Sequence, residues 1–273
     1  MANSVNTNIG ALVALSSLRS TNAELDKTSK RIQTGFRIAD AADDAAIFAV
    51  AQGIRGNVKA YASVQSSLAA GEGLGQVTAA ALTGISNLVG DLKAKFANLA
   101  DGSLTADQRT TYQNDATAIV NQITNFIDQA TYNGKNILNT AQSISFVADV
   151  SGTTLTLQTG TALSSGTAAV QTEIDAFATA DQYSVALAAL NTFEALVNSI
   201  SASVAAQSRS LNLQKSFVNE LVDATKKGLG ALVDADVAAE SAALQSLQVR
   251  QQLGVQALSI ANQQPNTLLS LFR

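Results

Sequence analysis

The sequence predicts a mainly α-helical protein, a long antiparallel helical bundle or coiled coil that carries a small β-hairpin. In the second half of the chain, apolar residues recur at every seventh position over successive heptads, which is the repeat of a coiled coil. A second apolar stripe, with steps of three and four residues, runs through the first half. Between the two, a short stretch alternates apolar and polar residues, as paired strands do.

The composition excludes most enzyme chemistry. The 273 residues contain no His and no Cys, so no side chain has an ordinary pKa near neutrality, and thiolate nucleophiles and cysteine-based metal sites are absent. The carboxylates lie on Ala-rich, helix-like stretches without convergent partners. We therefore expect no enzyme, no cofactor and no metal.

The charge and hydropathy of the chain limit the classes of partner that we expect. The formal net charge of −4 combines both signs, which argues against a nucleic-acid partner because such binding needs a basic face. No run of 18 apolar residues occurs, so we expect no membrane insertion. Only 14% of the residues are charged, so the surface either relies on neutral polar residues or is covered by partners.

An amphipathic helix is predicted from residue 9 to residue 32. Leu18, Leu25 and Ile32 follow one another at intervals of seven, with polar residues between them. Gly35 suits the left-handed position that ends many helices. A seam interrupted by polar residues makes only a marginal helix pair in isolation.

The stripe of the first half predicts a long helix. Gly71, Gly73 and Gly75 cluster near its middle, where they fit either a kink or the close approach of another helix. The stripe consists of Tyr61, Val64, Leu68, Gly71, Gly75, Thr78, Leu82, Ile85, Val89, Leu92, Phe96 and Leu99.

A third helix is predicted after the break at residues 101–103. Thr105 and Gln108 have the spacing of a capping box, and one apolar face follows between residues 112 and 130. These helices can bury their stripes only against one another, which predicts a bundle.

Residues 141–180 change character. Apolar and polar residues alternate on either side of residues 150–152, which predicts a β-hairpin near 143–158. Residues 159–172 are rich in Thr, Ser and Gly. We expect a surface loop there, either plainly solvated or glycosylated.

The heptads of the second half predict another long helix. Gln207 and Gln214 interrupt its second row, where they either fix the register of the helices or mark a solvated stretch. The first row consists of Tyr183, Leu190, Val197, Val204, Leu211, Val218 and Thr225.

The last helix, from residue 236 onward, has so many apolar residues that we expect its apolar face to pack against another surface. Exposed apolar surface of this kind marks an interaction site, and docking of the tail on the chain's own bundle is the alternative. We predict contacts between subunits through apolar residues of the two terminal helices and the tail: Ile9, Leu12, Leu15, Leu18, Leu25, Ile32, Val237, Leu244, Leu247, Leu258, Leu268, Leu269, Leu271 and Phe272.

Several stretches at the two ends of the chain resemble bacterial flagellin of the short type. The most specific is RIQTGFRIADAADDAA at 31–46, and QATYNG follows at 129–134. Near the C-terminus, DADVAAE stands at 234–240, ANQ at 261–263 and LLSL at 268–271. Within them, the residues that match the family motifs are Arg31, Arg37, Asp43, Asp44, Asn133, Gly134, Asp234, Asp236 and Glu240.

The resemblance implies a fold and a function. Flagellins self-assemble into the hollow helical filament that drives swimming, and their N- and C-terminal helices are paired in an inner coiled coil. Carried over to this chain, the inner domain is 1–40 plus 234–273, and the helical rod domain with the hairpin is 41–233. Because the long variable insertion of many members is missing, we expect a thin filament.

The resemblance also implies partners and a location. The chain is expected to contact many copies of itself in a helical homopolymer, and to meet the flagellar export chaperone and apparatus, the filament cap and the hook-junction proteins. It is expected outside the cell, in the flagellum, after type III export without a cleaved signal peptide. A hook–filament junction protein and a type III secreted coiled-coil protein are the alternatives.

The charged residues of the first motif allow two interpretations each. Asp40, Asp43 and Asp44 fit either a bound cation or the positive end of the next helix's dipole. Arg31 and Arg37 fit either acids of a neighbouring subunit or solvent.

Overall fold

The computed structural model describes residues 7–177, 179 and 182–270, with the backbone alone for 264–270. The chain divides into two compact units. Unit 1 comprises residues 1–56 and 224–273, and unit 2 comprises residues 57–223.

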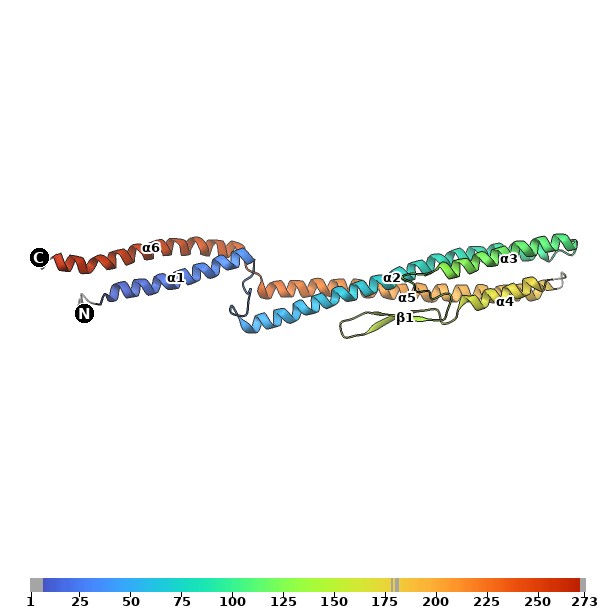
Figure 1. The fold of residues 1–273 in the computed structure, drawn as a ribbon, viewed down its shortest axis with the longest axis horizontal. Coiled ribbons are helices and arrows are strands. Elements are labelled where there is room, and N and C mark those ends of the chain that lie inside the picture. Colours follow the sequence, from blue (N-terminus) through green and yellow to red (C-terminus); the bar gives the residue numbers. More distant parts are fainter. Residues whose placement is uncertain (1–6, 178, 180–181, 271–273) are drawn as a thin grey trace. The chain divides into compact units, whose positions relative to one another are not determined.

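Helices make up most of the described residues, and the predicted fold class is confirmed (Figure 1). Unit 1 contains two terminal helices that lie side by side, and unit 2 contains two further helices and a two-stranded antiparallel sheet. Two long helices have residues in both units. In chain order, the elements are α1 (Ile9–Thr34), α2 (Ala45–Leu99), α3 (Ala106–Gln129), β1 (Ser143–Val147), β2 (Thr154–Gln158), α4 (Leu163–Asp175), α5 (Tyr183–Val233) and α6 (Val237–Ser270).

The apolar stripe of α2 and the heptad row of α5 form the core of unit 2. The two helices run antiparallel, because Gln65 Nε2 donates a hydrogen bond to Asn219 Oδ1 at 2.7 Å, and Lys215 pairs with Glu72 at 2.7 Å. The buried side chains of the two rows include Leu68, Leu82, Ile85, Leu92, Phe96, Leu190, Val197, Val204 and Leu211.

Helix α5 also has the length and apolar composition of a membrane-spanning helix, with a mean hydropathy of 1.3 over 18 residues. Its heptad residues Leu190, Val197 and Val204 are buried in the core of unit 2. A single helix of this kind is weak evidence for a membrane span, because the core helices of bundles meet the same criterion.

The glycines in the middle of α2 let neighbouring side chains approach the helix closely. Helix α2 is continuous through them. A Cβ at Gly75 would lie 2.4 Å from Ser208 Oγ of α5, and one at Gly71 would lie 3.0 Å from the ring of Phe146. The missing side chains therefore let α5 and the hairpin pack against α2.

Two predicted helix boundaries are confirmed. Thr105 and Gln108 form the reciprocal capping box at the start of α3. Gly35 follows α1 with φ 71°, and its N–H donates to the carbonyl of Arg31 at 2.8 Å.

The surface loop expected at residues 159–172 is wrong for most of its length. Helix α4 occupies Leu163–Asp175, and Leu163, Val170 and Ile174 are buried on one face. Its Ser, Thr and Gly residues are weak helix formers, so burial of that face overrides local propensity. Gly166 contributes directly, since a Cβ there would lie 2.5 Å from the ring of Phe193.

The hairpin forms where the sequence placed it, with Ile144 opposite Leu157. Gln207 accepts a hydrogen bond from Gln158 N at 2.7 Å and donates one to Gln158 O at 3.0 Å. Gln214 donates to Ala148 O at 2.9 Å. The polar interruptions of the α5 heptads therefore hold the backbone of the hairpin against α5.

Candidate assembly surface

The terminal helices pair along an antiparallel seam in unit 1 (Figure 1). Its residues recur in steps of three and four, which is the spacing of a coiled coil. Those of α1 are half-buried: Ala11, Leu15, Leu18, Asn22, Leu25, Ser29 and Ile32. Those of α6 are half-buried except for the buried Leu247: Glu240, Leu244, Leu247, Gln251, Gly254, Leu258 and Ala261.

Three polar contacts fix the register of this pair. At one end, Asn8 Nδ2 donates to Ala261 O at 2.6 Å. In the middle, Gln251 Nε2 donates to Asn22 Oδ1 at 2.8 Å. At the other end, Arg31 Nη1 pairs with Glu240 Oε1 at 2.9 Å.

The side chains of Arg31 and Glu240 are 26% and 16% exposed, and both residues come from the motif stretches. Arg31 therefore pairs within its own chain, which neither interpretation of the sequence anticipated. Its Nε is buried and has no hydrogen-bond acceptor among the described residues. Removing either partner would leave a charge in a poorly solvated place.

Two short segments connect the terminal helices to the long helices: residues 35–44 join α1 to α2, and residues 234–236 join α5 to α6. They contact each other and are called the junction below. Phe36 and Asp234 form an isolated antiparallel bridge, and Ala235 N donates to Gly35 O at 2.9 Å. The guanidinium of Arg37 donates to Leu232 O at 2.7 Å. A small apolar cluster lies beside these contacts, made of Ile38, Ile47, Phe48, Ala51, Leu229, Leu232 and Val233.

The acidic motif residues cap helices. Asp44 Oδ1 accepts hydrogen bonds from Ala46 N and Ile47 N, both at 3.0 Å, at the start of α2. Asp236 Oδ1 accepts from Ala238 N and Ala239 N at the start of α6. Both side chains therefore satisfy N–H groups that a first helical turn leaves free.

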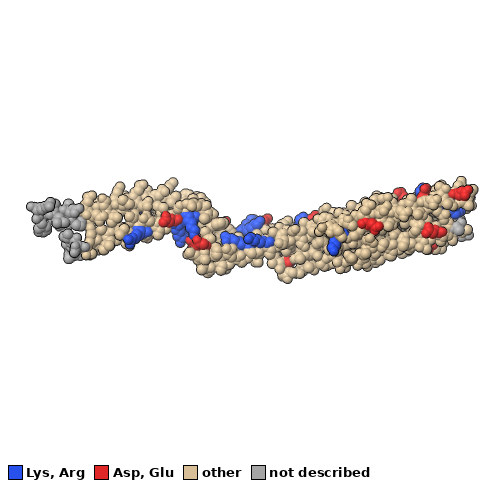
Figure 2. All heavy atoms as spheres, in the orientation of Figure 1, with Lys and Arg blue, Asp and Glu red and all other residues tan. Residues whose placement is uncertain are grey.

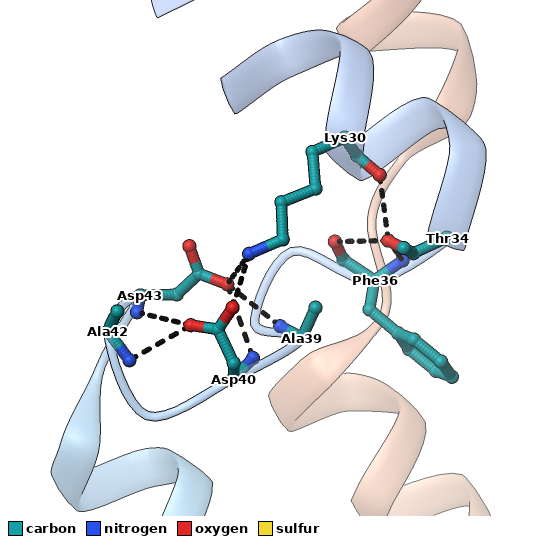
Figure 3. A network of polar contacts seen from close by, with 7 residues as sticks. All are labelled: Lys30, Thr34, Phe36, Ala39, Asp40, Ala42 and Asp43. Atoms are coloured by element: carbon teal, nitrogen blue, oxygen red, sulfur yellow. Dashed lines mark hydrogen bonds and ion pairs between the residues drawn. The ribbon is translucent and has the colours of Figure 1, made fainter. Parts of the chain in front are cut away.

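Asp40 and Asp43 form a network with Lys30, shown in Figure 3. Asp43 Oδ2 also accepts from Ala39 N at 3.0 Å, and Asp40 Oδ1 accepts from Ala42 N at 2.9 Å. Asp44 therefore has the expected place at the start of the next helix, whereas Asp40 and Asp43 bond to Lys30 and to the backbone of the turn, which neither interpretation of the sequence anticipated.

The same contacts shift the pKa values of the three groups. The hydrogen bond to Asp40 raises the pKa of Lys30, and the hydrogen bond from Lys30 lowers the pKa of Asp40. The backbone N–H of Ala39 is the main cause that lowers the pKa of Asp43. All three groups are thereby held in their charged forms.

Two motif residues lie in unit 2, away from the terminal helices in the sequence. Asn133 and Gly134 have φ values of 50° and 73°, and Tyr132 and Lys135 exchange two backbone hydrogen bonds of 2.9 Å around them. Consecutive left-handed residues favour Asn-Gly. Their role in the structure is a tight turn after α3.

The predicted contact residues fall into three groups. Leu15, Leu18, Leu25, Ile32, Leu244, Leu247 and Leu258 lie on the seam inside the subunit. Ile9, Leu12 and Val237 are exposed. The side chains of Leu268 and Leu269, and Leu271 and Phe272 altogether, lie outside the described residues. Whether any of them contacts another subunit stays a prediction.

The contact residues predicted from the sequence do not include several further exposed apolar residues. On α6, Ile260 is 70% exposed and Leu253 is 57% exposed, and on α1 Val13 is also exposed. The signal was present in the sequence, because Val249, Leu253 and Ile260 follow at i, i+4 and i+11 and make a second stripe beside the seam. The seam thus has an uncovered apolar margin.

A groove lies where the free end of α1 meets α6. It has a volume of about 420 Å³ and is lined by Ala11, Leu12, Leu15 and Leu258 together with Thr7, Asn8 and Asn262. An apolar floor beside exposed Ile9 and Leu12 can accept an apolar side chain from outside the subunit.

Comparison with known proteins covers almost the whole chain. The model of the bacterial flagellin N-terminal helical region matches residues 5–143, and that of the bacterial flagellin C-terminal helical region matches residues 186–272. Flagellin FljM of Caulobacter vibrioides is 39% identical over 272 residues, 99% of each chain. A flagellin of Brucella melitensis is 38% identical over 281 residues, 99% of each chain. The crystal structure of Bacillus cereus flagellin is 17% identical, covers 66% of this chain and 94% of that chain, and has a TM-score of 0.37.

Proposed function

The chain belongs to the bacterial flagellin family, and from this premise we propose that it polymerises through the uncovered margin of its α1–α6 pair. As a member of that family, it is a structural subunit of the flagellar filament used for motility. The relatives named above are all called flagellin, which favours the filament subunit over a hook–filament junction protein.

One observation supports the proposal: in unit 1, some large apolar side chains pack on the seam between α1 and α6, while others are exposed to solvent. Part of each terminal helix is used on the seam, while Ile9, Leu12, Val13, Val249, Leu253, Val255 and Ile260 stay exposed. Burying one such side chain contributes about 1.5–3 kcal/mol. A few of them per contact suffice to offset the ordering of the helices.

The arrangement also supports growth without closure. The exposed stripe of α6 and the groove beside Leu12 are unlike surfaces on one chain. Unlike surfaces that meet head to tail extend into an open helical polymer unless the rotation closes a ring. We propose 1–40 and 234–273 as the inner domain of that polymer and 41–233 as the outer rod.

The finer expectations follow from family membership. We propose that the chain has no catalytic role and is exported by the flagellar type III apparatus without cleavage of a leader. On the way it would meet an export chaperone, and in the filament it would meet the cap and the hook-junction proteins. Intact mass measurement of subunits from purified filaments tests the uncleaved state.

The main test compares two substitutions on one helix. Leu253→Asp places a charge on the exposed apolar stripe of α6, whereas Gln252→Asp places the same charge at an exposed polar position next to it. We expect Leu253→Asp monomers to keep their melting temperature within about 3 °C and to lose elongation on filament seeds in a sedimentation assay. Gln252→Asp should elongate within about twofold of the unchanged protein.

Equal elongation by the two variants would contradict the proposal. A large drop in melting temperature for Leu253→Asp alone would instead assign that stripe to the fold of the monomer. Electron microscopy of the pellets separates filaments from amorphous aggregate.

A further inference from the structure

Charge is divided unequally between the two units. Unit 1 contains 10 basic and 8 acidic residues, a net charge of +2, whereas unit 2 contains 7 basic and 13 acidic residues, a net charge of −6. The two values account for the net charge of −4 of the chain. Copies that align unlike units therefore bring opposite charges together.

The acids of unit 2 gather at the end that carries the turn between α2 and α3 (Figure 2). Asp101 and Asp107 belong to this turn and the start of α3, and Glu173 and Asp175 to the end of α4. The end of α4 is held beside α3, because Gln113 Nε2 donates to Ile174 O at 3.1 Å. These four residues are named the acidic end below.

Few basic side chains of the same subunit neutralise the acidic end. Arg109 lies there, but its guanidinium donates to the carbonyl oxygens of Leu99 and Asp101, at 2.6 and 3.3 Å. Among the residues that the structure describes, the carboxylates of Asp107 and Glu173 have no ion pair or hydrogen bond. Two carboxylates are thus available to an outside cation.

Unit 1 contains the basic residues Arg55 on α2 and Lys226 and Lys227 near the end of α5, which are named the basic surface below. Figure 2 shows Lys and Arg side chains over the end of α5. Both lysines are exposed, and within the described chain neither has a carboxylate within 4.0 Å. Arg55, on α2, has its guanidinium carbon 5.6 Å from the centre of the Phe36 ring. Asp223 lies one turn before Lys226 on α5 and offsets part of this positive charge.

We propose that a second copy of this chain places the acidic end of its unit 2 against the basic surface Arg55, Lys226 and Lys227. The inference rests on the proposed polymerisation and adds a charged contact to the apolar one of the terminal helices. Because the two surfaces differ, the contact repeats from copy to copy and extends the filament. Solvated ion pairs add little affinity, but complementary charge steers association and raises its rate.

The experiment swaps the charges. Lys226→Glu with Lys227→Glu reverses the basic surface, Asp107→Lys with Glu173→Lys reverses the acidic end, and a fourfold variant combines them. Lys135→Glu with Arg209→Glu serves as control, since it changes the net charge by as much as the lysine pair does at other exposed sites. Elongation on unchanged seeds and on seeds of each variant is followed by light scattering at 20 mM NaCl, after circular dichroism has compared the melting temperatures.

We expect each double reversal to elongate at least about tenfold more slowly on its own seeds, and the fourfold variant to recover to within about threefold of the unchanged protein. The control should stay within about twofold. Between 20 and 150 mM NaCl, the rate of the unchanged protein should fall, because salt screens exposed charges. A fourfold variant as slow as either double variant, a control as slow as the lysine variant, or a rate that rises with salt overturns the inference. Failure of the terminal-helix contact is a separate result, because it appears as equal elongation of Leu253→Asp and Gln252→Asp.

Discussion

Units 1 and 2 both rest on helices with heptad spacing, yet they bury very different fractions of their apolar residues. In unit 2, α3 alone has four buried residues, Ala116, Val120, Ile123 and Ile127. In unit 1, the buried residues on the paired helices α1 and α6 are Thr28 and Leu247 among those described. The same repeat therefore builds a closed core in one unit and a half-open seam in the other.

The difference teaches how one chain separates folding from assembly. Unit 2 surrounds its long helices with α3, α4 and the hairpin, so its stripes are covered on several sides. Among the described residues, the seam of α1 and α6 is half-buried except for Thr28 and Leu247, and most of the stability of a helix in a protein comes from the packing of its apolar face. Substitutions in unit 2 should therefore act on monomer stability, and substitutions in unit 1 on local opening and polymerisation.

The largest effect is expected from Val204→Asp. Val204 is 1% exposed in the middle of the α5 row, and a buried unpaired charge destabilises by about 3–5 kcal/mol. Ala206→Asp on the exposed face of the same helix is the control, with an expected change within about 0.5 kcal/mol. Urea unfolding followed by circular dichroism measures both. Equal midpoints for the two variants would mean that the α5 row does not carry the stability of unit 2.

The Arg31–Glu240 pair sharpens the comparison from the side of unit 1. Glu240→Ala should leave Arg31 without its partner and loosen the α1–α6 pair by about 1–3 kcal/mol. Amide hydrogen exchange of the monomer should become faster in α1 and α6, while exchange in α3 stays unchanged. Ser241→Ala, one residue along, is the control. Faster exchange in α3 as well would show that the two units open together.

Glycine substitutions test the close approach inside unit 2. Gly84→Ala places a Cβ 2.9 Å from the ring of Phe126 on α3, so we expect a loss of about 1–2 kcal/mol. Gly90 on the same helix has no neighbouring atom within 4 Å of an added Cβ, so Gly90→Ala should stabilise by about 0.5–1 kcal/mol through helix propensity. Thermal unfolding of the two variants should therefore shift in opposite directions; shifts of the same sign would refute the close packing of α2 on α3.

The smallest effect concerns pH, and it belongs to the junction of unit 1. The folded pKa values of Asp40 and Asp43 lie below the ordinary 3.8, so their stabilising contribution is present above pH 4 and is lost as pH falls through the folded values. The raised pKa of Lys30 means that its contribution is complete below 10.5 and is lost at higher pH. Limited proteolysis within residues 35–44 should accelerate below pH 4. Between pH 6 and 8 the urea midpoint should stay constant, because the chain has no His; a steep change there would reveal an acid with a strongly raised pKa.

The sequence by itself determined helices α1, α2, α3, α5 and α6, their apolar faces, two of their boundaries, the hairpin and the family. These features depend on local rules, since the heptads at 183–225, the capping box of Thr105 and the left-handed Gly35 need only neighbouring residues to be recognised. The motif stretches carried the identity for the same reason.

The tertiary structure decided what each face packs against. Helix α4 forms in a stretch of weak helix formers because Leu163, Val170 and Ile174 find a core to enter. Gln207 and Gln214 look like defects in a heptad row until the hairpin supplies the backbone groups that they bond. Arg31 finds Glu240 209 residues away, and the same fold leaves Leu253 and Ile260 uncovered. Periodicity identifies which side chains are to be buried. The segment that buries them is decided by contacts between residues far apart in the sequence. Such contacts leave no pattern in the local sequence.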